Sequence, residues 1–377
     1  MTEFVRRMRS EGSGLYGGNE GWRRVHVDLP LLLLLLLLCG AGLFVLYSAS
    51  GQNVHMVTRQ AAYMGLGLLI ALLVAQCSPR FMRRWAILPY VAGVLLLVAV
   101  DLVGVGAKGA QRWLDLGFMR FQPSEILKIA CPLMIASYLG RQHLPPRFLH
   151  LCVAMAVLLV PSVLIGLQPD LGTALLVLAS GLFGVFLAGI GKRYIFTALA
   201  AGLAAAPLFW LFLLHDYQRR RILTMLDPQA DKLGAGWNII QSTTAIGSGG
   251  IHGKGWMQGT QSQLDFLPES HTDFIIAVLA EEFGLTGVVM LMALYLLIIA
   301  RGFFIAFNAP SSFGRLLAGS LTLTFFVYIF VNMGMVSGIL PVVGVPLPLV
   351  SYGGTSIVTL MLGFGMLMAI STEKKRV

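Results

Sequence analysis

The sequence predicts an all-α, polytopic membrane protein. Hydrophobic residues make up 57% of the chain and charged residues 12%, with a mean hydropathy of +0.80. Soluble globular domains carry about twice that share of charge. Apolar runs of about 20 residues, the length that crosses a bilayer as a helix, recur along the chain. The four cysteines all fall in apolar runs and show no CxxC or metal-ligand spacing, which indicates packing residues.

One membrane domain is predicted between two short cytoplasmic tails. Residues 1–28 are polar and rich in glycine and arginine and form the first tail, residues 29–371 form the membrane domain, and residues 372–377 form the second tail. Residues 215–272 form a long extracytoplasmic loop between the seventh and eighth spans. The ten predicted transmembrane helices lie near residues 30–48, 60–77, 86–105, 124–139, 149–167, 171–189, 194–214, 274–299, 313–336 and 350–370.

The distribution of basic residues supports ten spans and gives their orientation. With both termini in the cytoplasm, the inner segments hold 17 of the 27 lysines and arginines. Five of the nine in the outer segments lie in the long loop, which the positive-inside rule weights less. Topology therefore explains the net charge of +10, and no basic stripe with interleaved aromatic residues indicates nucleic-acid binding.

Almost all unusual polar motifs fall in the outer segments. Four spans begin there with residues typical of helix starts: Pro123 and Ser124, Pro169 and Asp170, Ser270 to Asp273, and Pro348 to Ser351. Four helix N-termini that converge would form a positively polarised basin suited to an anion. Their convergence cannot be read from the sequence.

Asp273 has two interpretations. Ser270 and Asp273 have the spacing of a capping box, which would simply start the eighth span. The same aspartate lies beside Glu269 and His271 at a boundary between water and membrane, where a carboxylate can act as a general base. The two roles are compatible, and both stay open.

Other charged residues lie inside predicted spans. Glu125 and Lys128 share one helix face at i, i+3, either as a charge-neutralised pair or as a ligand-binding lysine with its orienting carboxylate. Asp170 is either a helix-dipole partner or a ligand contact. Glu281 and Glu282 differ in phase by about 100°, so they cannot face one partner, and a structural role is favoured.

The long loop carries a basic cluster that includes Arg219 and Arg221. It is either a solvated patch or a binding site for a lipid phosphate or pyrophosphate, for which arginine is suited. The stretch GSGGIHGKGW at 247–256 lacks the first glycine and the final Ser or Thr of a phosphate loop, which excludes an NTPase. Chemistry at the outer face cannot draw on ATP. It therefore needs a substrate with its own activated bond, such as a lipid-linked sugar diphosphate.

The motifs WLDLG, QPSEILK, QPDLGT, LPESHTDFIIAVLAEEFG and LPLVSYGGTS, in this order, resemble those of the SEDS family (shape, elongation, division and sporulation). The resemblance covers nearly the whole chain after residue 28 and is closer to the rod-shape-determining elongation type than to the division type. It implies the SEDS fold, which is GT-C-like, in the bacterial inner membrane. It also implies a glycosyltransferase that polymerises lipid II into β-1,4 glycan strands at the periplasmic face. The implied partners are a class B penicillin-binding protein and other elongation-complex membrane proteins.

The resemblance also implies roles for individual residues. Asp273 matches the essential loop carboxylate and Trp113 a functionally sensitive tryptophan. Intramembrane polar residues of the family are matched by Glu125, Lys128 and Asp170, and its loop cations by Arg221 and Lys254.

The expected reaction is an inverting sugar transfer. Asp273 would take the proton from the acceptor 4-hydroxyl, and the pyrophosphate leaving group would be held by some of Arg219, Arg221, Lys128 and Lys254. His271 would assist in substrate binding. The participation of a divalent cation, Mg²⁺ or Mn²⁺, stays open. Two alternatives remain, a lipid II transporter and a non-catalytic scaffold for the transpeptidase. The absence of a detectable internal repeat argues against the transporter.

Overall fold

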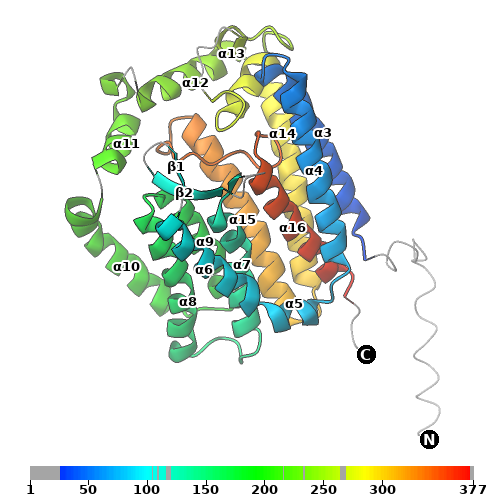
Figure 1. The fold of residues 1–377 in the computed structure, drawn as a ribbon, viewed down its shortest axis with the longest axis vertical. Helices are drawn as coiled ribbons and strands as arrows, with labels where there is room; N and C mark the ends of the chain where they lie inside the picture. The colour runs from blue at the N-terminus through cyan, green and yellow to red at the C-terminus, as the bar shows by residue number, and fades with distance from the viewer. Residues whose placement is uncertain are drawn as a thin grey trace, which may run out of the picture.

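The computed structural model describes residues 26–103, 105–107, 110–115, 120–214, 216–231, 234–263 and 269–373. It is a helical bundle with one small sheet (Figure 1). The long helices are α3 (Leu29–Ala49), α4 (Val54–Ala75), α6 (Ile87–Val103), α7 (Pro123–Leu139), α8 (Phe148–Leu167), α9 (Leu171–Leu187), α10 (Lys192–Leu208), α14 (Ile275–Asn308), α15 (Ser312–Val336) and α16 (Gly354–Ser371). The shorter helices are α5 (Pro79–Trp85), α11 (Asp216–Leu226), α12 (Ala235–Gly249) and α13 (Thr260–Gln263).

Every predicted span coincides with one of the long helices. Within the described residues, seven helices are long and apolar enough to cross a membrane, or eight if α5 and α6, bent by 43° at their junction, count as one span. The other two helices, α7 and α9, have 17 residues each, and α7 also carries Glu125 and Lys128. The helical architecture is therefore confirmed, while ten spans with both termini in the cytoplasm remain a prediction.

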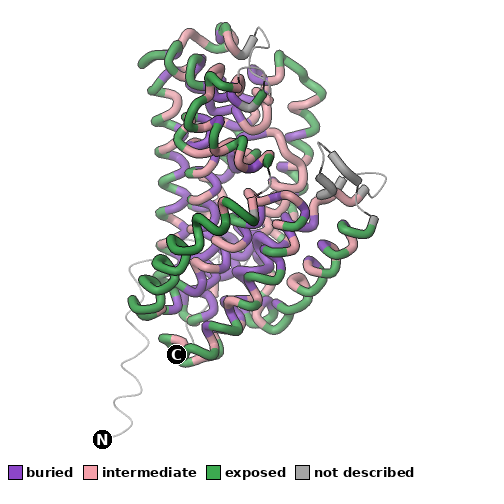
Figure 2. The backbone as a smooth tube through the Cα atoms, turned by 90° about the vertical axis from the view of Figure 1, so that its left-hand side faces the viewer, coloured by how far each residue is buried: buried purple, intermediate pink, exposed green. Residues whose placement is uncertain are grey.

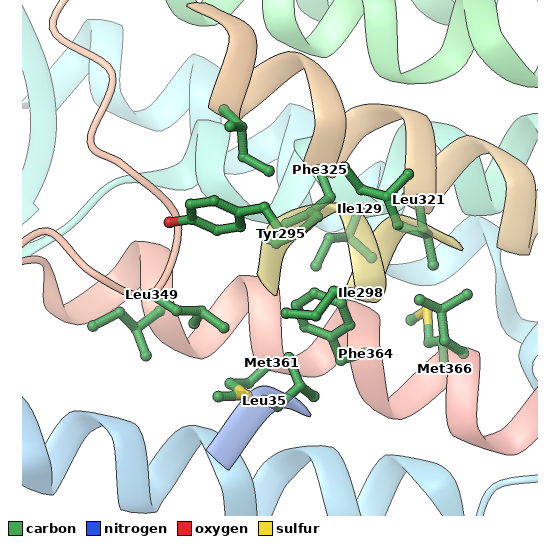
Figure 3. Packing of buried hydrophobic residues seen from close by; sticks show 14 of the residues in the cluster. Leu35, Ile129, Tyr295, Ile298, Leu321, Phe325, Leu349, Met361, Phe364 and Met366 are labelled. Carbon is green, nitrogen blue, oxygen red and sulfur yellow. The ribbon is translucent and has the colours of Figure 1, made fainter. Parts of the chain in front are cut away.

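The core forms where α3, α7, α14, α15 and α16 meet (Figure 3). Tyr295, fully buried on α14, lies 5.8 Å from the ring of Phe325, which in turn lies 5.1 Å edge-on from Phe364. Leu35 and Ile129 fill the space around these rings. Figure 2 shows the buried backbone concentrated in the interior of the bundle. This interior is a rigid frame, because interlocked aromatic rings leave few alternative packings.

The segment predicted as a long loop is largely helical. Its helices are α11, α12 and α13, and together with α10, the predicted seventh span, they follow one side of the bundle and then cross its upper end (Figure 1). No residue of α10 is buried, so this helix exposes apolar side chains all round, as a lipid-facing span does.

A three-stranded antiparallel sheet precedes α7, with strands β1 (Val105–Ala107), β2 (Ala110–Asp115) and β3 (Arg120–Phe121). In its register Trp113 pairs with Val105. The sequence did not predict this sheet.

Helix α14 is broken at Gly284, where φ is +63° and ψ is −161°. Only glycine adopts this conformation readily. Residues 250–255 complete the backbone hydrogen bonds that the break leaves unmade in α14, at 3.0–3.1 Å. The amides of Lys254 and Gly255 donate to the carbonyls of Glu281 and Glu282, and the amides of Leu285 and Thr286 donate to the carbonyls of Gly250 and Ile251. The connection after α12 is thus fastened into α14, which satisfies backbone groups that are costly to leave unpaired within a membrane domain.

Replacing Gly284 with alanine is expected to destabilise the fold by about 2 kcal/mol or more, because the new Cβ would sit in a glycine-only conformation. That Cβ would also lie 2.4 Å from the amide nitrogen of Gly253. The measurement is the thermal unfolding midpoint of the purified protein. Gly40→Ala in α3 is the matched control, since nothing lies within 4 Å of its added Cβ. Equal midpoints for the two variants would contradict the role assigned to the break.

Candidate functional site

A buried ion pair lies at the start of α7. Lys128 Nζ is 2.6 Å from Glu125 Oε1, and both side chains are 9% exposed. The ammonium group also lies 5.0 Å from the ring centre of Tyr328 on α15, and Thr359 on α16 donates to Glu125 Oε2 at 3.3 Å. The i, i+3 pairing predicted from the sequence is confirmed. Three helices therefore share one buried charge pair, and its mutual neutralisation makes it tolerable inside the bundle.

A cavity of about 40 Å³ lies against this pair. At that size it holds roughly two or three water molecules. Its polar lining comes from Glu125, Lys128, Thr324, Tyr328, Ser351, Ser356 and Thr359. The lining joins α7, α15 and α16 with residues 346–351, the segment before α16.

Asp170 starts α9 as a helix cap. Its Oδ1 accepts from the amide of Thr173 at 3.2 Å, and its Oδ2 accepts from Gln122 Nε2 at 3.3 Å. Gln122 directly precedes α7, so the N-termini of α7 and α9 lie side by side. The helix-dipole role predicted for this aspartate is therefore present.

The capping box predicted for Asp273 is wrong. Helix α14 begins only at Ile275, its N-cap is Phe274, and no side chain caps it. Ser270 instead donates its hydroxyl to the carbonyl of Ala49, at the end of α3, at 3.2 Å. A tertiary partner thus replaces the local one. Asp273 is half-buried in the turns before α14 rather than in the first turn of the helix.

Asp273 is held by two other parts of the chain. Asn332 on α15, fully buried, donates from Nδ2 to the Asp273 carbonyl at 2.8 Å and to the Val345 carbonyl at 2.7 Å. A Cβ built on Gly344 would lie 3.5 Å from Asp273 Oδ2, which places the carboxylate beside that glycine. Asn332 was not singled out from the sequence. A lone amide within an apolar run was the signal that could have identified it.

The segment 339–353 brings three helix starts together. Val343 packs against Gly172 in the first turn of α9 so closely that a Cβ there would overlap it. The amide of Tyr352 donates to the carbonyl of His271 at 2.9 Å, and the two rings lie edge-on at 6.3 Å. Ser351 donates to the carbonyl of Thr272. The starts of α9, α14 and α16 therefore share this segment, while α7 joins them through Gln122 and Asp170.

The predicted loop cations do not form one cluster. Arg221 is exposed and lies 5.8 Å from the ring of Tyr217, whose hydroxyl donates to Pro169 at the start of α9. Arg219 lies 3.7 Å from Asp216 and donates to a backbone carbonyl. These two arginines thus belong to α11 near the α9 start. Trp113 is half-buried on β2.

Lys254 has a structural partner that the sequence did not predict. Its Nζ lies 2.7 Å from Glu281 Oε1, and the Glu281 side chain is fully buried. The same oxygen accepts from the amides of Thr260 and Gln261 at 2.8 and 3.0 Å. The structural role favoured for Glu281 is confirmed, and Lys254 is one of the donors that hold its carboxylate.

In the parts of the chain that the structure describes, no group of three or more His, Cys, Asp and Glu could hold a metal ion.

Comparison with known proteins agrees with this geometry. The model of the FtsW/RodA/SpoVE family, described as cell cycle proteins, matches residues 29–376. The chain belongs to this family. The resemblance to SEDS proteins inferred from the motifs is thereby confirmed. The chain is 54% identical to the peptidoglycan glycosyltransferase MrdB of Escherichia coli, over 94% of this chain and 96% of the relative. This similarity confirms the elongation-type character of the resemblance. A probable peptidoglycan glycosyltransferase FtsW of Geobacter sulfurreducens is 37% identical, over 92% and 96%.

Solved structures of family members share the fold. A chain from a peptidoglycan synthase complex, described as coordinating polymerization and crosslinking, matches with a TM-score of 0.81 and 34% identity, covering 92% of this chain and 97% of that one. The crystal structure of the rod shape determining protein RodA of Thermus thermophilus matches with a TM-score of 0.70 and 31% identity, over 92% and 96%.

Removing one member of the buried pair is expected to destabilise this family member more than removing both. Lys128→Met leaves the Glu125 carboxylate buried without its cation, which costs about 3–5 kcal/mol, whereas Lys128→Met combined with Glu125→Gln restores much of that loss. The measurement is a double-mutant cycle of thermal unfolding in detergent. Additive effects of the two substitutions would show that the pair contributes no coupling.

Proposed function

We propose that this chain is a peptidoglycan glycosyltransferase that polymerises lipid II into β-1,4 glycan strands during cell elongation. Its similarity to the relative named peptidoglycan glycosyltransferase MrdB supports the activity. The observation that carries the assignment of the site is the placement of Asp273. Its backbone is fixed by a fully buried amide, and its carboxylate lies beside the segment that joins the helix starts.

The proposed reaction is a displacement with inversion at the anomeric carbon of the donor. The acceptor 4-hydroxyl oxygen forms the new bond to that carbon while the bond from the carbon to the pyrophosphate oxygen breaks. The departing electron pair stays on undecaprenyl pyrophosphate, and the hydroxyl proton passes to the Asp273 carboxylate. Because the hydroxyl is a weak nucleophile, removal of its proton in the transition state accelerates the attack.

Cationic groups near the helix starts would hold the leaving group. Lys128 lies in the wall of the buried cavity, paired with Glu125. Arg219 and Arg221 lie on α11, where the hydroxyl of Tyr217 donates to the Pro169 carbonyl at the start of α9. Arginine can bind a pyrophosphate in bidentate fashion. Lys254 keeps a candidate role here with 27% of its side chain exposed, although Glu281 already neutralises it. Trp113, Asp170, Glu125 and His271 are the remaining proposed substrate contacts.

The proposed setting is the bacterial inner membrane, with ten spans, both termini in the cytoplasm and Asp273 facing the periplasm. The excess of lysine and arginine in the opposite segments supports this orientation. The proposed partners are a class B penicillin-binding protein as transpeptidase and other elongation-complex proteins. The similarity to a chain of a peptidoglycan synthase complex that coordinates polymerization and crosslinking supports the first of these.

Asp273→Asn is expected to lower polymerisation by about 10²–10⁴-fold, because asparagine cannot accept the acceptor proton. The measurement is glycan-chain formation from purified lipid II by the full-length protein with its transpeptidase partner. Asp227→Asn is the control. It is an exposed loop aspartate whose Oδ1 accepts, among the residues that the structure describes, a single local amide at 3.2 Å, and asparagine can replace it there. Wild-type rates with Asp273→Asn would show that another group acts as base, and a folding check by thermal unfolding separates loss of chemistry from loss of structure.

A further inference from the structure

A second hollow lies at the end of the bundle opposite Asp273. Its volume is about 510 Å³, within the range of small-ligand sites. It forms where α5 meets the end of α14 and the start of α15, at the lower end of Figure 1. The lining residues are Pro79, Arg80, Arg83, Phe307, Asn308, Ala309, Pro310, Ser311, Phe313, Arg315 and Glu373. None of them belongs to the candidate active site.

The charge in this hollow is unbalanced. Three arginines line it against one glutamate, and among the described residues no carboxylate lies within ion-pair distance of Arg80, Arg83 or Arg315. Arg301 on α14 shows the contrasting case, since its Nη2 lies 2.7 Å from Asp28 Oδ2, next to the start of α3. The ion pair of Arg301 fastens α14 to the start of α3. The three in the hollow are left available for an external anion.

The hollow is built on fixed backbone. Ser137 on α7 donates its hydroxyl to the carbonyl of Arg83 at 2.8 Å, which fastens α5 to the bundle. Arg315 donates its Nε–H to the carbonyl of Ala309 at 3.0 Å. Within the described structure its two terminal amino groups have no further protein partner. They are the part of the guanidinium that can donate two parallel hydrogen bonds to a phosphate.

The lining is amphipathic as well as cationic. Phe307 lines the hollow and is 80% exposed, and the apolar side chains of Pro79 and Phe313 lie in the same wall. On α5, Phe81 and Trp85 are also exposed, as aromatic side chains are at a membrane interface. A ligand here would contact apolar surface and three guanidinium groups at once. We propose that this hollow binds the phosphate headgroup of an anionic phospholipid of the inner leaflet, of the phosphatidylglycerol type.

The positive-inside rule explains why arginines are frequent at this end of the molecule. It does not require that three of them line one hollow. Arg84, the next residue along α5, is exposed and lies outside the lining, and so do Arg147 and Arg193. The chain therefore offers a control set with the same residue type and the same charge. The proposal goes beyond the glycosyltransferase assignment and shares with it only the orientation of the chain.

The test is lipid binding by the full-length, delipidated protein in native mass spectrometry, with phosphatidylglycerol and phosphatidylethanolamine supplied in equal amounts. Wild type is expected to retain phosphatidylglycerol preferentially. The triple variant Arg80→Gln, Arg83→Gln, Arg315→Gln should lose about tenfold in that retention, as the loss of charge-assisted hydrogen bonds predicts. The control triple variant Arg84→Gln, Arg147→Gln, Arg193→Gln should stay within about twofold of wild type.

A gain-of-binding variant guards against misfolding as an explanation. Glu373→Gln removes the one carboxylate in the lining, so it should strengthen phosphatidylglycerol retention. Equal losses in the two triple variants, or no preference between the two lipids, would overturn the proposal. Displacement of the lipid by millimolar inorganic phosphate would assign the hollow to a free anion instead, and that outcome would overturn the lipid as its occupant.

Discussion

The geometry of the candidate site depends on one buried amide. Asn332 lies in an apolar helix, is fully buried, and uses both hydrogens of its amide group on carbonyls from two distant segments. One of these carbonyls belongs to Asp273 and the other to Val345. A buried carbonyl without a donor is costly in a membrane domain, so each segment is stabilised where this amide reaches it. The proposed base therefore has a fixed backbone although it lies outside regular helix.

The same requirement accounts for the rest of the end of the bundle that carries Asp273, where irregular backbone is supported by other parts of the chain. Tyr295, from the centre of the core, donates its hydroxyl to the carbonyl of Pro348 at 2.7 Å. Ser351 accepts from the amide of Leu347 at 2.8 Å and donates to Thr272. On α14, Glu281 accepts hydrogen bonds from Lys254 and from the backbone amides of Thr260 and Gln261. Non-helical chain is tolerated in this part of the bundle because protein groups complete its hydrogen bonds.

The sequence predicted what depends on local spacing. The ten apolar runs correspond to helices, Asp170 caps α9, and Glu125 pairs with Lys128 three residues away. It failed where the partner is distant along the chain. The capping box at Ser270 was wrong because that hydroxyl bonds Ala49, 221 residues away, and the partner of Lys254 lies 27 residues away. The periodicity of apolar residues along the sequence does not indicate contacts between distant segments. Asn332 was missed for the same reason, because its partners are the carbonyls of Asp273 and Val345. Helix α11 of the long loop was missed because it is polar and short.

The proposed catalytic groups are divided between parts of the molecule that differ in packing. Asp273 precedes a helix whose first ten residues, Ile275 to Gly284, are nearly all buried. Arg219 and Arg221 lie on α11, which follows a helix with no buried residue. Proton transfer requires a base at hydrogen-bond distance, which a rigid seat provides. A pyrophosphate on a long lipid can instead be held by extended arginine side chains, whose reach tolerates small displacements, at the entropic cost of ordering them. The unequal burial of the two parts therefore matches the unequal geometric demands of the base and of the leaving-group contacts.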